Sequence, residues 1–196
     1  MTNYNSMLQQ LYQQINKIIE LTKEEFDLVK SHFFEKKFKR KETILRKGEV
    51  CKHVYFILDG CIRYYYNVEG EEHTGQFFFE NGWYTDFDSY LTGQPSQQNI
   101  DALEATKLLM ISKVSMELIY QKIPVFEKFG KIMAENAFLG LKNRTKMLTN
   151  LNAEERYISL INERPKVIER IPQHYIASYI GIKPQSLSRI RKKIAL

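Results

Sequence analysis

The sequence has few cysteines and no long apolar run. Two cysteines in 196 residues, Cys51 and Cys61, cannot form a framework of several disulfides or supply the four thiolates of an iron–sulfur cluster. No apolar run approaches the roughly 20 residues of a membrane span, and the first ten residues, MTNYNSMLQQ, lack the apolar core of a signal peptide. We therefore expect a cytoplasmic protein that does not contact a membrane and whose two thiols are reduced and half-buried.

The sequence also lacks patterns for catalysis and for metal or cofactor binding. The four histidines are scattered, and the local group Glu-Glu-His at residues 71–73 is typical of a solvated hairpin rather than of a metal site. There is no catalytic triad, no phosphate-binding glycine loop and no cofactor fingerprint. We expect a protein that is not an enzyme and that holds neither a metal nor a cofactor.

Charge is distributed unevenly along the chain. Residues 131–196 contain 13 Lys and Arg against 5 Asp and Glu, whereas residues 1–130 contain 16 against 18, so the C-terminal third carries the whole excess of positive charge. Residues 64–106 are the opposite extreme, with eight acidic residues and no Lys or Arg. Segregated positive charge is typical of a surface that binds nucleic-acid phosphates.

The same basic third contains a helix-turn-helix pattern at residues 173–190, QHYIASYIGIKPQSLSRI. Gly181 stands where the chain must turn with positive φ, which glycine adopts without a Cβ penalty. Pro172 and Pro184 suit the first turns of the two helices, where no helical N–H donor is needed. Ala177 is small where the helices approach most closely. The apolar residues that would hold the two helices together are Ile176, Ile180, Ile182, Leu187 and Ile190.

The second helix of this pattern would lie in the major groove of double-stranded DNA. Arg189 is the candidate for a bidentate contact to guanine, Gln185 for a contact to adenine or a mixed contact, and Lys192 for a contact to phosphate. Similar helix pairs occur in proteins that do not bind DNA, so a ligand- or metal-binding protein without DNA-binding activity remains the alternative. The full candidate DNA-binding set is Gln173, His174, Lys183, Gln185, Ser186, Ser188, Arg189, Arg191, Lys192 and Lys193.

Residues 34–112 alternate short β-rich runs with turn signals. Turns every eight to twelve residues, with a two-residue Asp-Gly link at residues 59–60, favour an antiparallel barrel or jelly roll. Aromatic residues concentrate here, where they would either line an apolar effector pocket or fill the core. The predicted strands are residues 43–46, 53–58, 61–67, 74–79 and 107–111. The candidate pocket residues are Phe79, Trp83, Tyr84, Phe87 and Tyr90.

Helical periodicity flanks the β-rich region. Residues 5–33 predict helices, with a capping box from Thr22 to Glu25. Residues 115–121 predict a short helix, and a long helix of about 26 residues is expected from Pro124 to residue 150. Asn152 would cap a further helix, which Pro165 ends, and residues 166–171 would then cross to the helix-turn-helix.

The long helix is apolar on two sides, and such a helix must bury both. One side would lie on the β-domain, and the other would contact a second copy of the chain. The alternative is a monomer that buries the helix completely. The side predicted to face the partner is Val125, Phe129, Ile132, Asn136, Leu139 and Asn143, and the other side is Phe126, Met133, Ala137, Leu141 and Leu148.

The order of β-roll, long helix and helix-turn-helix resembles the Crp/Fnr family of transcription regulators, relatives of the cyclic-AMP receptor protein. Residues 44–72, ILRKGEVCKHVYFILDGCIRYYYNVEGEE, resemble the family's roll signature, and residues 176–193, IASYIGIKPQSLSRIRKK, resemble its recognition motif. The resemblance covers nearly the whole chain. It implies a homodimer that binds a palindromic DNA operator and senses an unknown small-molecule effector in the β-roll, with RNA polymerase as a further partner. Gln185, Ser186 and Arg189 fall where the family's recognition helix meets DNA.

The chain departs from the family pattern in two places. Members that bind cyclic nucleotides hold the ribose with a glutamate and the cyclic phosphate with an arginine, but the corresponding stretches here are GWYTDF at residues 82–87 and QPSQQN at residues 94–99. We therefore expect no binding of cyclic AMP. The sequence also ends at Leu196, where many relatives continue into a β-hairpin wing, so we expect a branch of the family without the wing.

These observations predict an α+β protein with three parts. Residues 1–123 would form a β-roll sensor domain with N-terminal helices, in a jelly-roll arrangement like that of cyclic-nucleotide-binding domains. Residues 124–150 would form the dimerisation helix, and residues 151–196 the helix-turn-helix domain. The roll also resembles the cupin jelly roll, but the closely spaced histidines of metal-binding cupins are missing.

Overall fold

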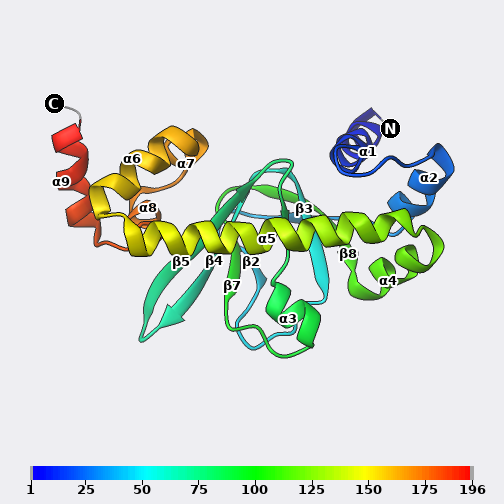
Figure 1. Ribbon diagram of the computed structural model, residues 1–196, viewed down its shortest axis with the longest axis horizontal. Coiled ribbons are helices and arrows are strands. Elements are labelled where there is room, and N and C mark those ends of the chain that lie inside the picture. Colours follow the sequence, from blue (N-terminus) through cyan, green and yellow to red (C-terminus); the bar gives the residue numbers. More distant parts are fainter. Residues whose placement is uncertain (1, 195–196) are drawn as a thin grey trace. The chain divides into compact units, whose positions relative to one another are not determined.

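The computed structural model describes residues 2–194 of the chain, with side chains from residue 7 onward (Figure 1). The fold is α+β, as predicted, and it contains a β-roll followed by a long helix and further helices. The chain divides into two compact units. The roll unit comprises Met1–Arg63 and Phe78–Ala137, and the C-terminal unit comprises Tyr64–Phe77 and Phe138–Leu196. The C-terminal unit therefore includes most of one β-hairpin from the roll sequence.

The β-roll consists of two four-stranded sheets with the orders β1-β8-β3-β6 and β2-β7-β4-β5. The pairings of β1 with β8, β8 with β3, β3 with β6 and β2 with β7 are antiparallel. The five predicted strands are confirmed. The strands are β1 (Phe34–Phe38), β2 (Thr43–Leu45), β3 (His53–Asp59), β4 (Cys61–Val68), β5 (Glu71–Phe79), β6 (Trp83–Tyr84), β7 (Asn99–Ala102) and β8 (Thr106–Ser112).

The core of the roll unit lies on the central strands β3 and β8. Phe56, Ile57 and Leu108 are completely buried, which explains why both strands have nearly continuous apolar sequences. The β3–β4 turn needs Gly60, because its φ is +98° and a Cβ there would come within 2.5 Å of the Thr106 hydroxyl. The Asp-Gly link identified in the sequence is therefore required by both backbone conformation and packing.

Four helices lie before, between or after the strands of the roll in the sequence. These are α1 (Thr2–Asn16), α2 (Lys23–Ser31), α3 (Phe87–Thr92) and α4 (Lys113–Lys122). The predicted capping box of α2 is present, since Thr22 Oγ1 accepts from the Glu25 amide at 3.2 Å and Glu25 Oε2 accepts from the Thr22 amide at 2.8 Å. Helix α3 was not predicted, because six residues are too few to show a helical period.

The long helix α5 (Val125–Asn150) has the predicted 26 residues. Its first half belongs to the roll unit and its second half to the C-terminal unit. Phe129 is completely buried, with its ring centre 5.1 Å from that of Trp83 and 5.0 Å from that of Phe126. The assignment of Phe129 to a partner-facing surface was therefore wrong, since this side chain is covered by its own chain.

Four shorter helices follow α5. They are α6 (Ala153–Glu163), α7 (Pro165–Arg170), α8 (Gln173–Tyr179) and α9 (Pro184–Ile194). Asn152 caps α6 through a complete capping box, as expected. Residues 166–171 were predicted to be a crossing segment, but most of them form α7 because Pro165 is at the first helical position, where proline is favoured. Among residues 2–194, no helix is long and apolar enough to cross a membrane.

Candidate nucleic-acid interface and effector region

Helices α8 and α9 are joined by the turn that the sequence predicts. Gly181 has φ +73°, and the Ile182 amide donates to the Ala177 carbonyl at 3.0 Å. Ile176, Ile180 and Leu187 are buried together with Ala177. The predicted apolar positions thus hold the two helices against the rest of the C-terminal unit, and the polar side of α9 stays accessible.

The exposed side of α9 brings together part of the predicted DNA-binding set. Gln185, Ser188, Arg189 and Lys192 are exposed and recur at intervals of three, one and three residues, which places them on one face of a helix. Arg189 and Lys192 form no ion pair within the described residues. We call these four residues the α9 face. The α9 face therefore presents the guanidinium group of Arg189, the side-chain amide of Gln185 and the ammonium group of Lys192 on one side of a single helix.

The remaining predicted DNA-binding residues lie around this face. Ser186 is half-buried, and Lys193 donates to Glu154 Oε2 at 2.7 Å. Arg191 lines a shallow hollow beside Tyr157 of α6. On α8, the exposed Gln173 and His174 precede the turn, and the imidazole of His174 lies against the Tyr175 ring.

Lys183, at the start of α9, is paired within the chain. Its ammonium group contacts both carboxylate oxygens of Glu71, at 2.6 and 2.9 Å, and this hydrogen bond holds the pKa of Glu71 below its ordinary value. Glu71 lies in the β4–β5 hairpin, whose predicted solvated residues 71–73 are indeed exposed. Sequence analysis missed this pairing, because the two residues are 112 positions apart.

A second contact fixes the same hairpin to α8. The Ser178 hydroxyl donates to the Glu72 carbonyl at 2.7 Å and accepts from the Thr74 amide at 2.9 Å. Ser178 and Lys183 stand on either side of the Gly181 turn. The acidic hairpin therefore covers one edge of the turn that precedes the α9 face, within one compact unit.

The aromatic residues proposed as a possible effector pocket are largely packed against other rings. Trp83 lies 4.6 Å from Phe56 and 6.2 Å from Phe33 between ring centres, in addition to its contact with Phe129. Tyr90 is buried. Of the other candidates, Tyr84 stacks on Phe78, while Phe79 and Phe87 are half-buried. This packing favours the core interpretation over the pocket for Trp83 and Tyr90.

The stretch that corresponds to the family's nucleotide-binding residues is occupied by its own polar contacts. The Ser96 hydroxyl lies 2.6 Å from Asp86 Oδ2, and the Gln98 amide donates to the Tyr84 hydroxyl at 2.7 Å. Asp86 is only 7% exposed, and residues 82–99 contain no Lys or Arg. The absence of cyclic-nucleotide binding stays a prediction.

The roll unit nevertheless contains a fully buried cation. Arg63, one residue before the acid-only stretch, is 1% exposed and lies 3.9 Å from Asp101 on β7. No local sequence pattern predicts this pair, because its two residues lie 38 positions apart. The nearby carboxylate offsets the charge of the arginine within the chain.

The two thiols are more deeply placed than expected. Cys51 and Cys61 were predicted to be half-buried, but both are fully buried, and neither forms a disulfide. Each follows a turn into a central strand, where a small apolar side chain packs well. Within the part of the chain that the structure describes, no three His, Cys, Asp or Glu side chains are grouped as a metal site would require.

Comparison with known proteins agrees with this architecture. Residues 35–122 match the family model of the cyclic nucleotide-binding domain. FixK2 from Bradyrhizobium japonicum has a similar structure, with a TM-score of 0.72 and 17% identity over 83% of this chain and 84% of that one. No curated protein sequence matches the chain.

Two further solved structures are similar. The c-di-GMP responsive global regulator CLP of Xanthomonas campestris has a TM-score of 0.70 and 13% identity, over 89% of this chain and 92% of that one. A structure from Eubacterium rectale, described as a transcriptional regulator of the Crp/Fnr family, has a TM-score of 0.68 and 16% identity over 89% and 84%. Residues 35–122 thus resemble a cyclic nucleotide-binding domain, and the chain shares its fold with these solved structures.

Proposed function

We propose that this protein is a homodimeric, sequence-specific DNA-binding transcription regulator of the Crp/Fnr type. The observation that carries the proposal is the α9 face, which is exposed, polar and basic on a helix fixed by a glycine turn. The C-terminal third supplies the whole positive excess of the chain, which suits it to bind phosphates. The similarity to regulators in fold supports the same conclusion.

In this proposal Arg189 and Gln185 read base edges in the major groove, and Lys192 contacts phosphate. A homodimer would present two such helices to a palindromic operator with half-sites about one helical turn apart. The functional division is a sensor domain at residues 1–123, a dimerisation helix at residues 124–150 and a DNA-binding domain at residues 151–196. A direct DNA-binding assay distinguishes this protein from a ligand-binding roll protein without DNA-binding activity.

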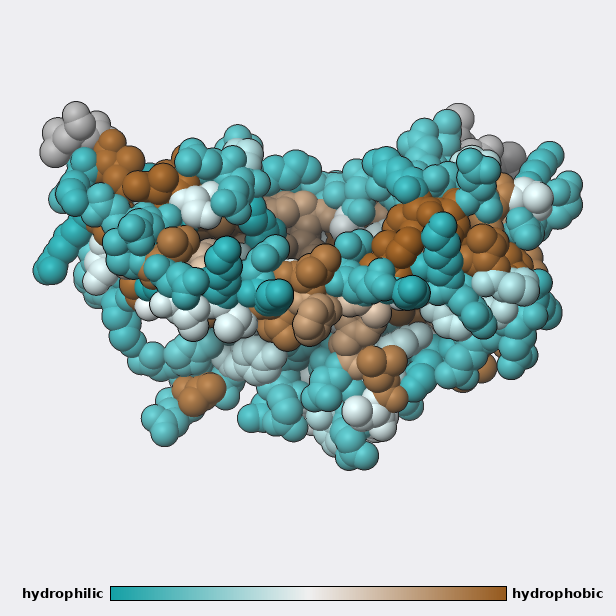
Figure 2. Space-filling view, viewed as in Figure 1, coloured by the Kyte–Doolittle hydropathy of each residue, from teal (hydrophilic) through white to brown (hydrophobic). Residues whose placement is uncertain are grey.

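The proposed dimer contact lies on the second half of α5. Phe138, Leu141, Thr145 and Leu148 recur at intervals of three, four and three residues, as in a coiled-coil seam. All four are exposed, Phe138 at 66% and Leu141 at 60%. Figure 2 shows apolar surface over the middle of α5. An exposed apolar stripe of this kind is a candidate for association with a second copy.

This stripe replaces the partner-facing side chosen from the sequence. That side contains the buried Phe129 and the half-buried Ile132, so it does not form one exposed surface. Leu139, although 52% exposed, lies on the opposite side of the helix from Leu141, because two residues correspond to about 200° of rotation. The other members of that side, Val125, Asn136 and Asn143, are exposed.

The first prediction separates base reading from phosphate binding. Arg189→Ala should reduce discrimination between the operator and altered sites by about 1–3 kcal/mol at the contacted base pair. Lys192→Ala should weaken binding to all sequences alike and lower the salt slope of log K by about 0.9. Fluorescence anisotropy with operator and scrambled duplexes at several salt concentrations measures both, with the exposed Lys122→Ala on α4 as the control. The reverse pattern would mean that the two roles are wrongly assigned.

The second prediction concerns the acidic hairpin. Glu71→Gln should strengthen DNA binding by about two- to fivefold at low salt, because it frees Lys183 and removes a negative charge beside the groove-facing helix. The matched control is Glu24→Gln, an exposed acid on α2. Binding is measured by anisotropy under the same conditions. Unchanged or weaker binding of the Glu71 variant would contradict the prediction.

The third prediction tests the dimer contact. Leu141→Glu should weaken self-association by at least about tenfold, because a carboxylate would have to be buried in the apolar stripe. Leu139→Glu introduces the same charge on the opposite side of the helix and should leave association unchanged. Sedimentation velocity over a concentration series distinguishes them. Dissociation by Leu139→Glu alone would instead support the partner-facing side chosen from the sequence.

The fourth prediction concerns the effector domain. Isothermal titration of the full chain with cyclic AMP or cyclic GMP should show no binding at micromolar concentration, because residues 82–99 contain the buried carboxylate of Asp86 and no Lys or Arg to bind the cyclic phosphate. Micromolar affinity for either nucleotide would overturn this expectation.

A further inference from the structure

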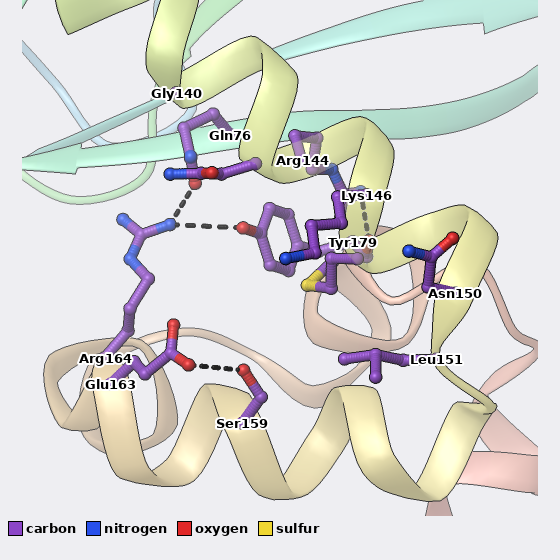
Figure 3. Close-up of a pocket in the computed structure, with 12 residues that line it drawn as sticks. Gln76, Gly140, Arg144, Lys146, Asn150, Leu151, Ser159, Glu163, Arg164 and Tyr179 are labelled. Atoms are coloured by element: carbon purple, nitrogen blue, oxygen red, sulfur yellow. Dashed lines mark hydrogen bonds between the residues drawn. The ribbon is translucent and has the colours of Figure 1, made fainter.

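The C-terminal unit contains a cavity of about 600 Å³. Its walls are β5, the second half of α5, helix α6 with the residue that follows it, and Tyr179 of α8 (Figure 3). All of the lining residues belong to this one unit. The volume lies within the roughly 300–1,000 Å³ of sites that bind small molecules. No role in DNA reading or dimerisation has been assigned to this cavity.

Three cations line the cavity. Arg144 stacks on the Tyr179 ring with its guanidinium carbon 3.8 Å from the ring centre, and Arg164 approaches the same ring at 5.9 Å. Lys146 is the third cation and is exposed at the rim. The one acid among the lining residues is Glu163, whose carboxylate accepts from the Ser159 hydroxyl at 2.9 Å. The lining residues therefore carry a net charge of +2.

Neither arginine is paired with a carboxylate within the described residues. Arg144 donates to the backbone carbonyls of Thr74 and Tyr179, and its Nη1 atom is buried without a hydrogen-bond partner. Arg164 donates to the Phe77 carbonyl at 2.7 Å. It also donates to the side-chain oxygen of Gln76 and to the Tyr179 hydroxyl, as Figure 3 shows. All of these acceptors are neutral, so neither guanidinium group forms an ion pair within the described residues.

A partly buried guanidinium group without an ion-pair partner is energetically costly. Burial lowers the pKa of Arg144 below its ordinary value, and the charges of Arg156 and Arg164 lower it further, although nearby tyrosines act in the opposite direction. Buried charges are normally paired, and guanidinium groups suit phosphate oxygens because they can donate two parallel hydrogen bonds. A bound anion would supply the missing counter-charge.

We propose that this cavity binds a phosphate monoester of a polar small molecule, of about the size of a sugar phosphate or a nucleoside monophosphate. The dianionic phosphate balances the +2 charge of the lining, whereas a cyclic phosphodiester carries only one negative charge. The cavity is much larger than a phosphate group, and the side-chain amides of Gln76, Asn143 and Asn150 offer donors and acceptors to a polar body. The ligand would contact the elements that hold α8, which carries the first half of the proposed DNA-binding motif.

The test uses the full chain without DNA, so its outcome is independent of DNA binding. Isothermal titration with glucose 6-phosphate and with AMP should give saturable binding to at least one of them, with cyclic AMP and succinate at least about tenfold weaker. Arg144→Gln should weaken that binding at least about tenfold, and Lys146→Gln should weaken it severalfold. Lys142→Gln is the matched control, because Lys142 is an exposed cation on the same helix that does not line the cavity.

Thermal unfolding followed by circular dichroism shows whether each variant folds, and Lys146→Gln keeps the test valid if Arg144→Gln does not fold, since Lys146 is exposed. Three outcomes would overturn the proposal. The first is that neither monoester binds at concentrations up to about 10 mM. The second is that succinate or cyclic AMP binds as tightly as the monoesters. The third is that the affinity for the monoesters is unchanged in the folded Arg144 and Lys146 variants.

Discussion

The structure depends on helix α5, because the two halves of this helix belong to different units and pack against different residues. Its first half buries Phe126 and Phe129 in the roll unit, while its second half supplies Arg144 to the cavity of the C-terminal unit. A helix of 26 residues is about 39 Å long, so it can contribute to both units without a break. One face of the second half remains apolar and exposed. The proposed dimer, the cavity and the placement of α8 therefore all share one rigid element.

The β4–β5 hairpin is the second element that links function to fold. Its base is part of the roll sheet, but residues Tyr64–Phe77 belong to the C-terminal unit, where Ser178 and Arg164 bind its backbone. Bonds to backbone atoms fix the position of the hairpin whatever its side chains are. Its acidic side chains then determine the electrostatic field beside the Gly181 turn. A change in the hairpin would thus alter the charge near the DNA-binding surface without changing α9 itself.

The sequence predicted those elements whose pattern is local. Five strands, the capping box of α2, the Asn152 cap of α6 and the Gly181 turn were all predicted, because each depends on residues within a few positions of one another. Strands β1, β6 and β7 were not predicted, since three of the five residues of FEKKF in β1 are charged, β6 has only two residues and β7 only four. The contacts of Ser178 and Lys183 with the hairpin join residues more than 100 positions apart, so no local pattern could reveal them. The burial of Phe129 by its own chain was also missed, because periodicity shows that α5 has two apolar sides but not which residues its own chain covers.

The cations around α9 differ in how they are held in the free chain, and this difference bears on how the surface would work. Lys183 and Lys193 are paired with Glu71 and Glu154, whereas Arg189 and Lys192 form no ion pair within the described residues. Exposed ion pairs contribute only about 0–1 kcal/mol, so DNA phosphates can displace the two glutamates at little cost. The paired lysines would therefore keep most of their affinity for phosphate, reduced only by the cost of that exchange. Specific recognition would then rest mainly on the α9 face, whose side chains are already free to meet the groove.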